Sequence, residues 1–147
     1  MLSKLFFTRL IIFIFLILFF IHLVAIYFSL YWIVDWLDIV MHFLGGIWLA
    51  LIAIWLFYFS GKMNVSGISF GWQIFFLVGV AALGGVLWEF FEFGFDNLFL
   101  HNFEEFKILP GCAQLGVADT MSDLFFDLLG GLIGGLIFLK KIKNNEK

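Results

Sequence analysis

The sequence predicts an all-α polytopic membrane protein, in which residues 1–147 form a single transmembrane domain. We expect a four-helix transmembrane bundle with both termini in the cytoplasm. Hydrophobic residues make up 64% of the chain and charged residues only 13%, whereas a soluble domain has roughly a quarter charged residues. Four apolar runs are long enough to cross about 30 Å of hydrocarbon, which takes about 20 helical residues. These runs are continuously apolar, without the alternation that is typical of a membrane β-barrel.

The four predicted spans cover residues 10–32, 39–59, 70–95 and 121–139. The first span follows Lys4 and Arg9, as the apolar core of a signal peptide would. It is longer than the roughly 7–15 apolar residues of such a core and no A-x-A-like cleavage site follows, so we interpret it as an uncleaved span. The long connection over residues 96–118 is predicted to be an external loop, and residues 140–147 a cytoplasmic tail.

The basic residues indicate the orientation of the bundle. Seven of the eight lie on the side of both termini, and only Lys107 lies on the other side. The positive-inside rule places the side rich in Lys and Arg in the cytoplasm. No segment provides the basic face that nucleic-acid binding requires. The single cysteine, Cys112, excludes an internal disulfide and a zinc site built from cysteines.

The acidic residues gather on the opposite side. Ten of the eleven, all except Glu146, lie outside the membrane or in the outer half of a span. Several of these acids lie within predicted spans at spacings of three or four residues, which places them on one face of a helix. The residues that share a face in this way are Asp38 with His42, Glu89 with Glu92, and Asp119 with Asp123 and Asp127. Asp127 lies roughly 9 Å below the predicted start of its span, at about 1.5 Å per residue. A charged group at that depth is expected to face the bundle interior or water.

The same helix faces carry small residues, which allow helix backbones to approach closely. Gly45 and Gly46 follow His42, and Gly131 and Gly135 continue the row of aspartates. The three acidic faces are therefore expected to meet. Six carboxylates would then share one space with no Lys or Arg to pair them, so either some are protonated or a divalent cation is bound.

A donor set of carboxylates with one imidazole suits Mg, Mn, Ca, Fe or Zn. The predicted metal ligands are therefore Asp38, His42, Asp119, Asp123 and Asp127. The ion itself is not specified by this pattern. The set lacks the paired Glu-x-x-His motifs of di-iron bundles.

Several of these residues also have simpler interpretations. Asp38 and Asp119 fit as N-caps in favourable contact with a helix dipole. Glu89 and Glu92 could simply lie at the solvent-exposed end of a membrane span. For Asp123 and Asp127, a purely structural role requires buried acids without a counter-charge. His22, in the first span, is interpreted as a packed histidine that is hydrogen-bonded to a neighbour.

Three segments resemble the YjdF-like family of small bacterial inner-membrane proteins: DIVMHFLGG over residues 38–46, WEFFEF over 88–93 and DTMSDLFFDLLGG over 119–131. More distantly, they are similar to the VanZ-like proteins associated with teicoplanin resistance. The resemblance covers the second to fourth spans and implies a bacterial inner (plasma) membrane location. The family's polar positions fall on Asp38, His42, Glu89, Glu92, Asp119 and Asp123.

Two positions depart from the family pattern. Met121 stands where the family has glutamine, and Asp127 where it has an apolar or small residue. Family members also have more spans, which implies that this chain needs a membrane partner or a second copy of itself. The resemblance supplies no reaction.

Three functions fit these observations. The first is a metal-dependent enzyme acting on a lipid or lipid-linked substrate at the outer leaflet, with Glu89 or Glu92 as general base. The absence of a serine or cysteine nucleophile motif favours direct hydrolysis or transfer. The second is a cation-coupled or proton-coupled transport component. The third is a non-catalytic membrane scaffold held together by the cluster.

Overall fold

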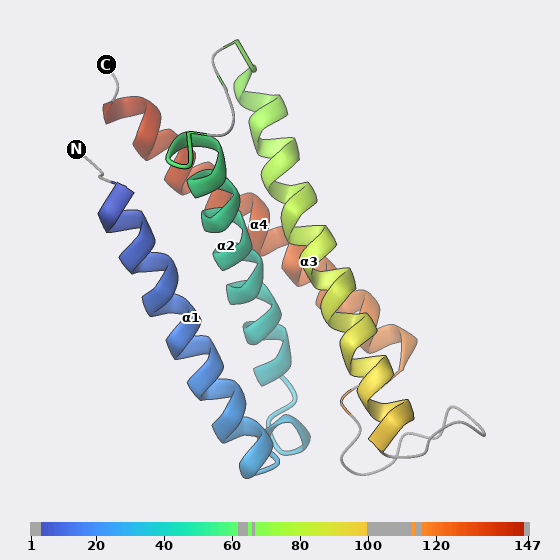
Figure 1. Ribbon diagram of the computed structural model, residues 1–147. Coiled ribbons are helices and arrows are strands. Elements are labelled where there is room, and N and C mark those ends of the chain that lie inside the picture. The colour runs from blue at the N-terminus through green and yellow to red at the C-terminus, as the bar shows by residue number, and fades with distance from the viewer. Residues whose placement is uncertain (1–3, 62–64, 66, 100–112, 114–115, 146–147) are drawn as a thin grey trace.

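All regular structure in the part of the chain that the computed structural model describes is helical (Figure 1). This part comprises residues 4–61, 65, 67–99, 113 and 116–145. Its elements are α1 (Lys4–Tyr27), the short 3-10 helix η1 (Leu30–Trp32), α2 (Leu37–Tyr58), α3 (Phe70–Phe99) and α4 (Val117–Asn145). Each of the 4 α-helices is long and apolar enough to cross a membrane. The all-α fold class is confirmed, as expected for apolar chains whose backbone groups must bond internally in lipid.

The helix ends differ from the predicted spans. α1 begins at Lys4 and ends at Tyr27 rather than at residue 32. It stops early because Ser29 adopts a left-handed backbone with φ of 56°, which turns the chain into η1. α3 and α4 extend into the predicted external loop and tail, since a helix needs no apolar residues to continue past the bilayer. The predicted loop therefore loses residues 96–99, 117 and 118, and the tail loses 140–145. Residues 100–112, 114 and 115 lie outside the described part.

α2 is the central helix and contacts α1, α3 and α4. In Figure 1 it lies between α1 and α3, and α4 crosses behind it. α1 packs against α2 through two tryptophans: the Trp48 Nε1–H donates to the Ile11 carbonyl and the Trp55 Nε1–H to the Thr8 hydroxyl, both at 3.0 Å. The backbones of α1 and α3 stay apart over the described residues, but the two helices meet through the side chains of His22 and Trp88, whose ring centroids lie 5.3 Å apart.

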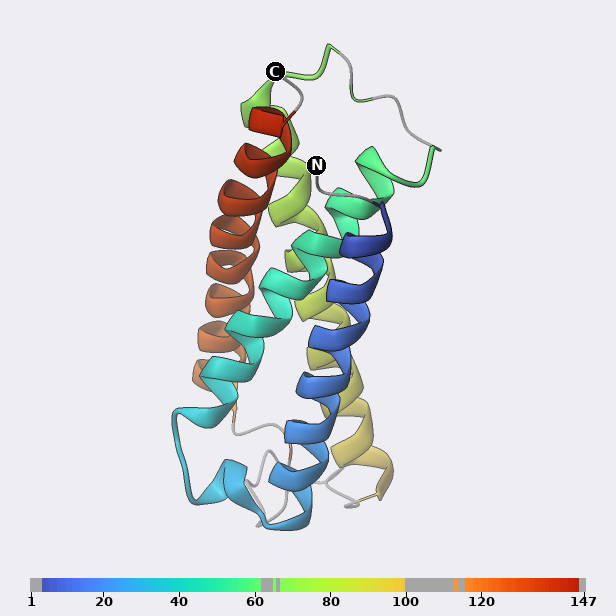
Figure 2. The same ribbon diagram turned by 90° about the vertical axis from the view of Figure 1, so that its left-hand side faces the viewer.

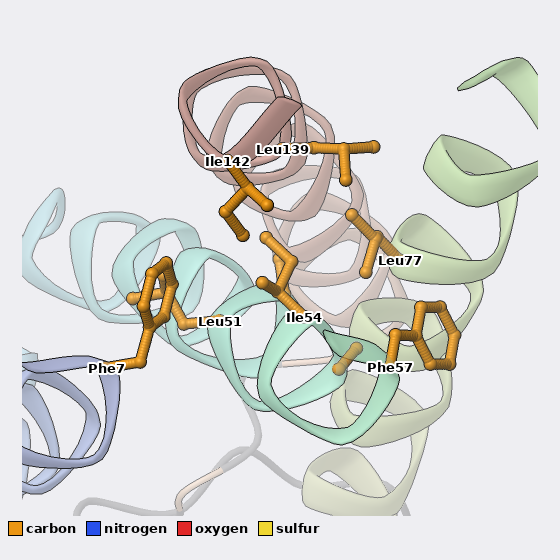
Figure 3. Packing of buried hydrophobic residues seen from close by; sticks show 9 residues of the cluster. Phe7, Leu51, Ile54, Phe57, Leu77, Leu139 and Ile142 are labelled. Carbon is orange, nitrogen blue, oxygen red and sulfur yellow. The ribbon is translucent and has the colours of Figure 1, made fainter. Parts of the chain in front are cut away.

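The two ends of the bundle have different character. α1 begins and α4 ends at the same end, as the prediction for the termini requires (Figures 1 and 2). We call this the basic end, because Lys4, Lys140 and Lys143 lie there, and the other the acidic end. An apolar cluster toward the basic end joins all four helices (Figure 3); its members are Phe7, Ala50, Leu51, Ala53, Ile54, Phe57, Leu77, Leu139 and Ile142. The buried acids and His42 lie in the other half.

Two glycines allow α2 and α4 to touch backbone to backbone. A Cβ atom at Gly46 would overlap the carbonyl oxygen of Asp127, and a Cβ atom at Gly130 would overlap that of Phe43. Only glycine fits at such contacts, as in other membrane helix pairs. The close approach brings the polar residues of α4 directly against His42.

Candidate functional site

His42 lies at the centre of the polar half and is almost fully buried, with 5% of its surface exposed. It points from α2 toward α3 and α4. Its Nδ1 shares a hydrogen bond of 3.0 Å with the Asp127 carboxylate of α4. Asp127 is itself buried. This bond fixes the imidazole ring, so that its second nitrogen, Nε2, faces the remaining acids.

Three carboxylates from three helices surround that second nitrogen. The His42 Nε2 lies 3.8 Å from Asp38 Oδ1 and 3.9 Å from Glu89 Oε1. Donor atoms of Asp38, His42 and Asp123 all lie within 4.8 Å of one another. We call Asp38, His42, Glu89, Asp123 and Asp127 the inner cluster. The structure thus brings together four of the five predicted metal ligands and one of the two predicted general bases.

Within the described residues, the buried atoms His42 Nε2 and Asp123 Oδ1 have no hydrogen-bond partner. The Asp123 side chain is 1% exposed. A buried polar group without a partner typically costs about 1–3 kcal/mol. His42 and Asp123, together with Asp38, therefore form a candidate ligand site.

Close packing of α3 brings Glu89 into the cluster. A Cβ atom at Gly85, one helical turn before Glu89, would overlap the carboxylate of Asp127. The absence of a side chain at Gly85 therefore makes room for Asp127 beside α3. The predicted close approach of helices at small residues is confirmed for Gly46, and the predicted Gly131 and Gly135 pack against Ala81 and Leu77 of α3.

The other two predicted site residues lie further toward the acidic end. Glu92 is buried and accepts a hydrogen bond of 2.8 Å from the Trp88 indole of its own helix. Asp119 is partly exposed and is not among the three residues whose donor atoms converge. Both acids line a second, outer space instead. The N-cap interpretation is wrong for Asp38, because Trp36 occupies that position of α2, and for Asp119, which lies inside the first turn of α4.

Two cavities flank the inner cluster. The inner cavity, of about 240 Å³, lies between α1, α2 and α3 and reaches His42 and Asp127. The outer cavity, of about 440 Å³, lies at the acidic end and reaches Asp119. Five residues line both cavities: His22, Tyr31, Asp38, Trp88 and Glu92. The inner cluster is therefore reachable from both spaces through Asp38.

Sequence reasoning missed Tyr31 as a site residue. Its hydroxyl shares a hydrogen bond of 2.8 Å with Nδ1 of His22, which confirms that His22 is hydrogen-bonded to a neighbour. Burial, together with the nearby carboxylates of Asp38 and Glu92, raises the pKa of the Tyr31 hydroxyl, so that it stays neutral. The sequence carries no local signal for Tyr31, because its position depends on the turn at Ser29.

Asp96 was also missed, because it was assigned to the external loop. It is a buried residue of α3 whose Oδ1 accepts a hydrogen bond of 2.8 Å from the backbone N–H of Ala113. The bond joins the end of α3 to the connection that leads into α4. The spacing of Asp96 from Glu89 and Glu92, seven and four residues along one helix face, was the available signal.

A bundle of four apolar helices with a buried carboxylate and imidazole cluster defines a small polytopic integral membrane protein. The chain belongs to the family described as "Predicted membrane protein (DUF2238)", whose model matches residues 2–144. No curated protein and no solved structure matches it.

Proposed function

We propose that the inner cluster binds a divalent cation, and that the protein is a metal-dependent enzyme acting on a lipid or lipid-linked substrate. In this proposal Asp38, His42 and Asp123 are the ligands. Asp127 holds the imidazole from its other nitrogen, which is the usual arrangement of a metal-bound histidine with a supporting carboxylate. Glu89 lies close enough to complete the donor set.

The observation that carries the proposal is the buried Nε2 of His42. Among the described residues this nitrogen has no hydrogen-bond partner, yet carboxylates of Asp38 and Glu89 lie 3.8 and 3.9 Å away. These distances are too long for hydrogen bonds, which span about 2.7–3.2 Å. They suit a small ion between the groups, because ligand bonds of about 2.0–2.6 Å place donor atoms roughly 3–5 Å apart.

The cation would neutralise acids that no basic side chain accompanies. No Lys or Arg occurs among the described residues that line either cavity. Ionised carboxylates in a low-dielectric space repel one another and require a counter-charge. A bound divalent ion supplies it, and it would also polarise a substrate oxygen or activate water.

Glu92 is the better placed of the two predicted general bases. It lines both cavities, whereas Glu89 faces His42. In hydrolysis of an ester or phosphoester, Glu92 would accept the proton of the attacking water, and the departing oxygen would leave with the electron pair of the broken bond. Trp88 orients the Glu92 carboxylate through its indole N–H.

Transport is less well supported than an enzyme. The buried apolar cluster of Figure 3 fills the half toward the basic end. The buried Gln73 in that half is engaged by the Tyr58 hydroxyl, which donates to its Oε1 at 2.7 Å, and donates in turn to the Ile68 carbonyl at 2.8 Å. A polar path across the described part of the bundle is therefore not evident.

Three further expectations stay predictions: a bacterial plasma membrane location, kinship with VanZ-like proteins, and a membrane partner or second copy of the chain.

Elemental analysis of protein purified in detergent without chelator tests the metal site. We expect one divalent ion per chain in the wild type and none in Asp123→Asn. Asp35→Asn is the matched control, since Asp35 is an exposed acid at the same end and should keep the ion. An ion-free wild-type protein would overturn the metal site and favour protonated acids.

A further inference from the structure

The inner cavity has a mostly apolar wall. Its lining includes Phe15, Leu18 and Phe19 of α1 and Trp48 and Leu49 of α2. Phe15 and Phe19 are also 44% and 49% exposed at the surface of the described bundle. The backbones of α1 and α3 stay apart in the described part of the chain, and the rings of His22 and Trp88, which both line the cavity, lie 5.3 Å apart between them.

Glycines on the bundle side form the floor of the inner cavity. Gly45, Gly84 and Gly85 line it. A Cβ atom at Gly84 would overlap Leu49 and one at Gly85 would overlap Asp127, so Gly45 is the position of these three where an added side chain has room to enter the cavity. At Gly45 a Cβ atom would meet only the Asp127 carboxylate, at an ordinary 3.9 Å. At about 240 Å³, the space is smaller than most small-molecule sites, which range over about 300–1,000 Å³. A narrow space of this size with a mostly apolar lining suits one hydrocarbon chain.

The lining of the outer cavity is more polar than that of the inner cavity. Four carboxylates line it, from Asp35, Asp38, Glu92 and Asp119. Its described lining contains no Lys or Arg, so it attracts cations and repels anions. Its volume of about 440 Å³ lies within the range of small-molecule sites. Because five residues line both cavities, the two spaces adjoin each other.

We propose that the two cavities together bind one amphiphile, with a hydrocarbon chain in the inner cavity and an ammonium-bearing headgroup in the outer cavity. The proposal rests on the proposed function, because it names the substrate class of the same site. Charge selects the headgroup: an ammonium group pairs with the outer carboxylates even when a cation already neutralises the inner cluster. The hydrogen-bonded pair His22 and Tyr31 and the pair Trp88 and Glu92 border the passage between chain and headgroup.

The test uses the full chain in nanodiscs of an uncharged glycolipid, with three photoactivatable probes. Each probe has one C16 chain with a terminal diazirine, and the headgroups are ammonium, phosphate and hydroxyl. After illumination, peptide mass spectrometry locates the cross-links. We expect the ammonium probe to label the inner-cavity walls on α1 and α2 most strongly, and the phosphate probe to label them least. Equal labelling by all three probes, or a preference for phosphate, would overturn the proposal.

Two variants fill the inner cavity from different helices: Gly45→Leu on α2 and Leu18→Trp on α1. Each should reduce labelling of the cavity walls several-fold. Their controls are Gly79→Leu, where a Cβ atom meets nothing within 4 Å, and Phe20→Trp, at a lipid-facing position that is 66% exposed. Both controls should label like the wild type. Unchanged labelling in both cavity variants would also overturn the proposal.

The outcome is separable from that of the metal proposal. Labelling is measured in chelator as well as with added divalent ion, and the ammonium probe should label the cavity walls in both. Loss of ion binding in Asp123→Asn with intact labelling would leave the amphiphile site standing. A normal ion content without cavity labelling would refute the amphiphile site alone.

Discussion

His42 and Asp127, which lie 85 residues apart in the sequence, share a buried hydrogen bond of 3.0 Å between α2 and α4. The bond depends on direct contact of the two helix backbones at Gly46. It also determines which imidazole nitrogen faces Asp38 and Glu89. A contact between helices thus orients the residue at the centre of the site.

Removal of this bond should destabilise the protein. We expect Asp127→Ala to lower the free energy of unfolding by about 1–3 kcal/mol, because it leaves His42 Nδ1 buried without a partner. Asp127→Asn, whose amide oxygen can still accept a hydrogen bond, should cost less. Thermal unfolding in detergent measures the difference. Asp35→Ala, an exposed acid at the same end, should change stability by less than about 0.5 kcal/mol, and a loss as large as that of Asp127→Ala would contradict a specific role for the bond.

Removal of the cation should lower the melting temperature of the wild type. Binding to the folded state alone adds about 2.7 kcal/mol at a free ion concentration of roughly one hundred times Kd. Chelator should therefore destabilise the wild type and the Asp35→Asn control, while Asp123→Asn should be insensitive to chelator. The prediction fails if chelator shifts the melting temperatures of wild type and Asp123→Asn equally.

Gly46→Ala should disrupt the contact between α2 and α4. The added methyl group would overlap the backbone of Asp127, and such overpacking typically costs about 1–3 kcal/mol. The neighbouring Gly45→Ala is a matched control, since its Cβ atom has an ordinary contact of 3.9 Å and alanine favours helix over glycine by about 1 kcal/mol. Melting temperatures of the two variants in the same detergent distinguish them, and similar losses would argue against the backbone contact.

Tyr31 should make the protein less stable in alkaline solution. Because its pKa in the folded state is raised above the ordinary tyrosine value of about 10, its contribution to stability is complete below that pH and is lost as the pH rises further. Tyr31→Phe lacks this titration. The stability of the wild type should therefore fall more steeply than that of the variant above about pH 10, as followed by urea unfolding. Parallel pH profiles would show that the hydroxyl ionises equally in both states.

Local features of the sequence predicted most of the fold. Apolar runs located all four membrane helices, and the charges at their ends correctly placed the start of α1 and the end of α4 on one side. The errors lie at helix ends, where hydropathy changes but the helix continues. Asp96 is the clearest example, because its position past the apolar run suggested a loop whereas the structure places it in α3.

The candidate site was predicted in composition but not in arrangement. Spacing of three or four residues placed the acids on three helix faces, which the structure brings together at His42. Spacing within a helix carries no information about the depth at which two helices cross. For that reason Asp119 and Glu92 could not be separated from the inner cluster, and Tyr31 and the cavities beside α1 could not be foreseen.

The sequence by itself determined the class of protein, the four helices and the segregation of acids from bases, because hydrophobicity and helical spacing are local properties. The tertiary structure alone decided which acid bonds to Nδ1 of His42, which acids face Nε2, and that two cavities adjoin the cluster. These features depend on the rotation and crossing of helices. The rotation and the crossing of the helices are determined by contacts between residues far apart in the chain, such as the contact of Gly46 with Asp127.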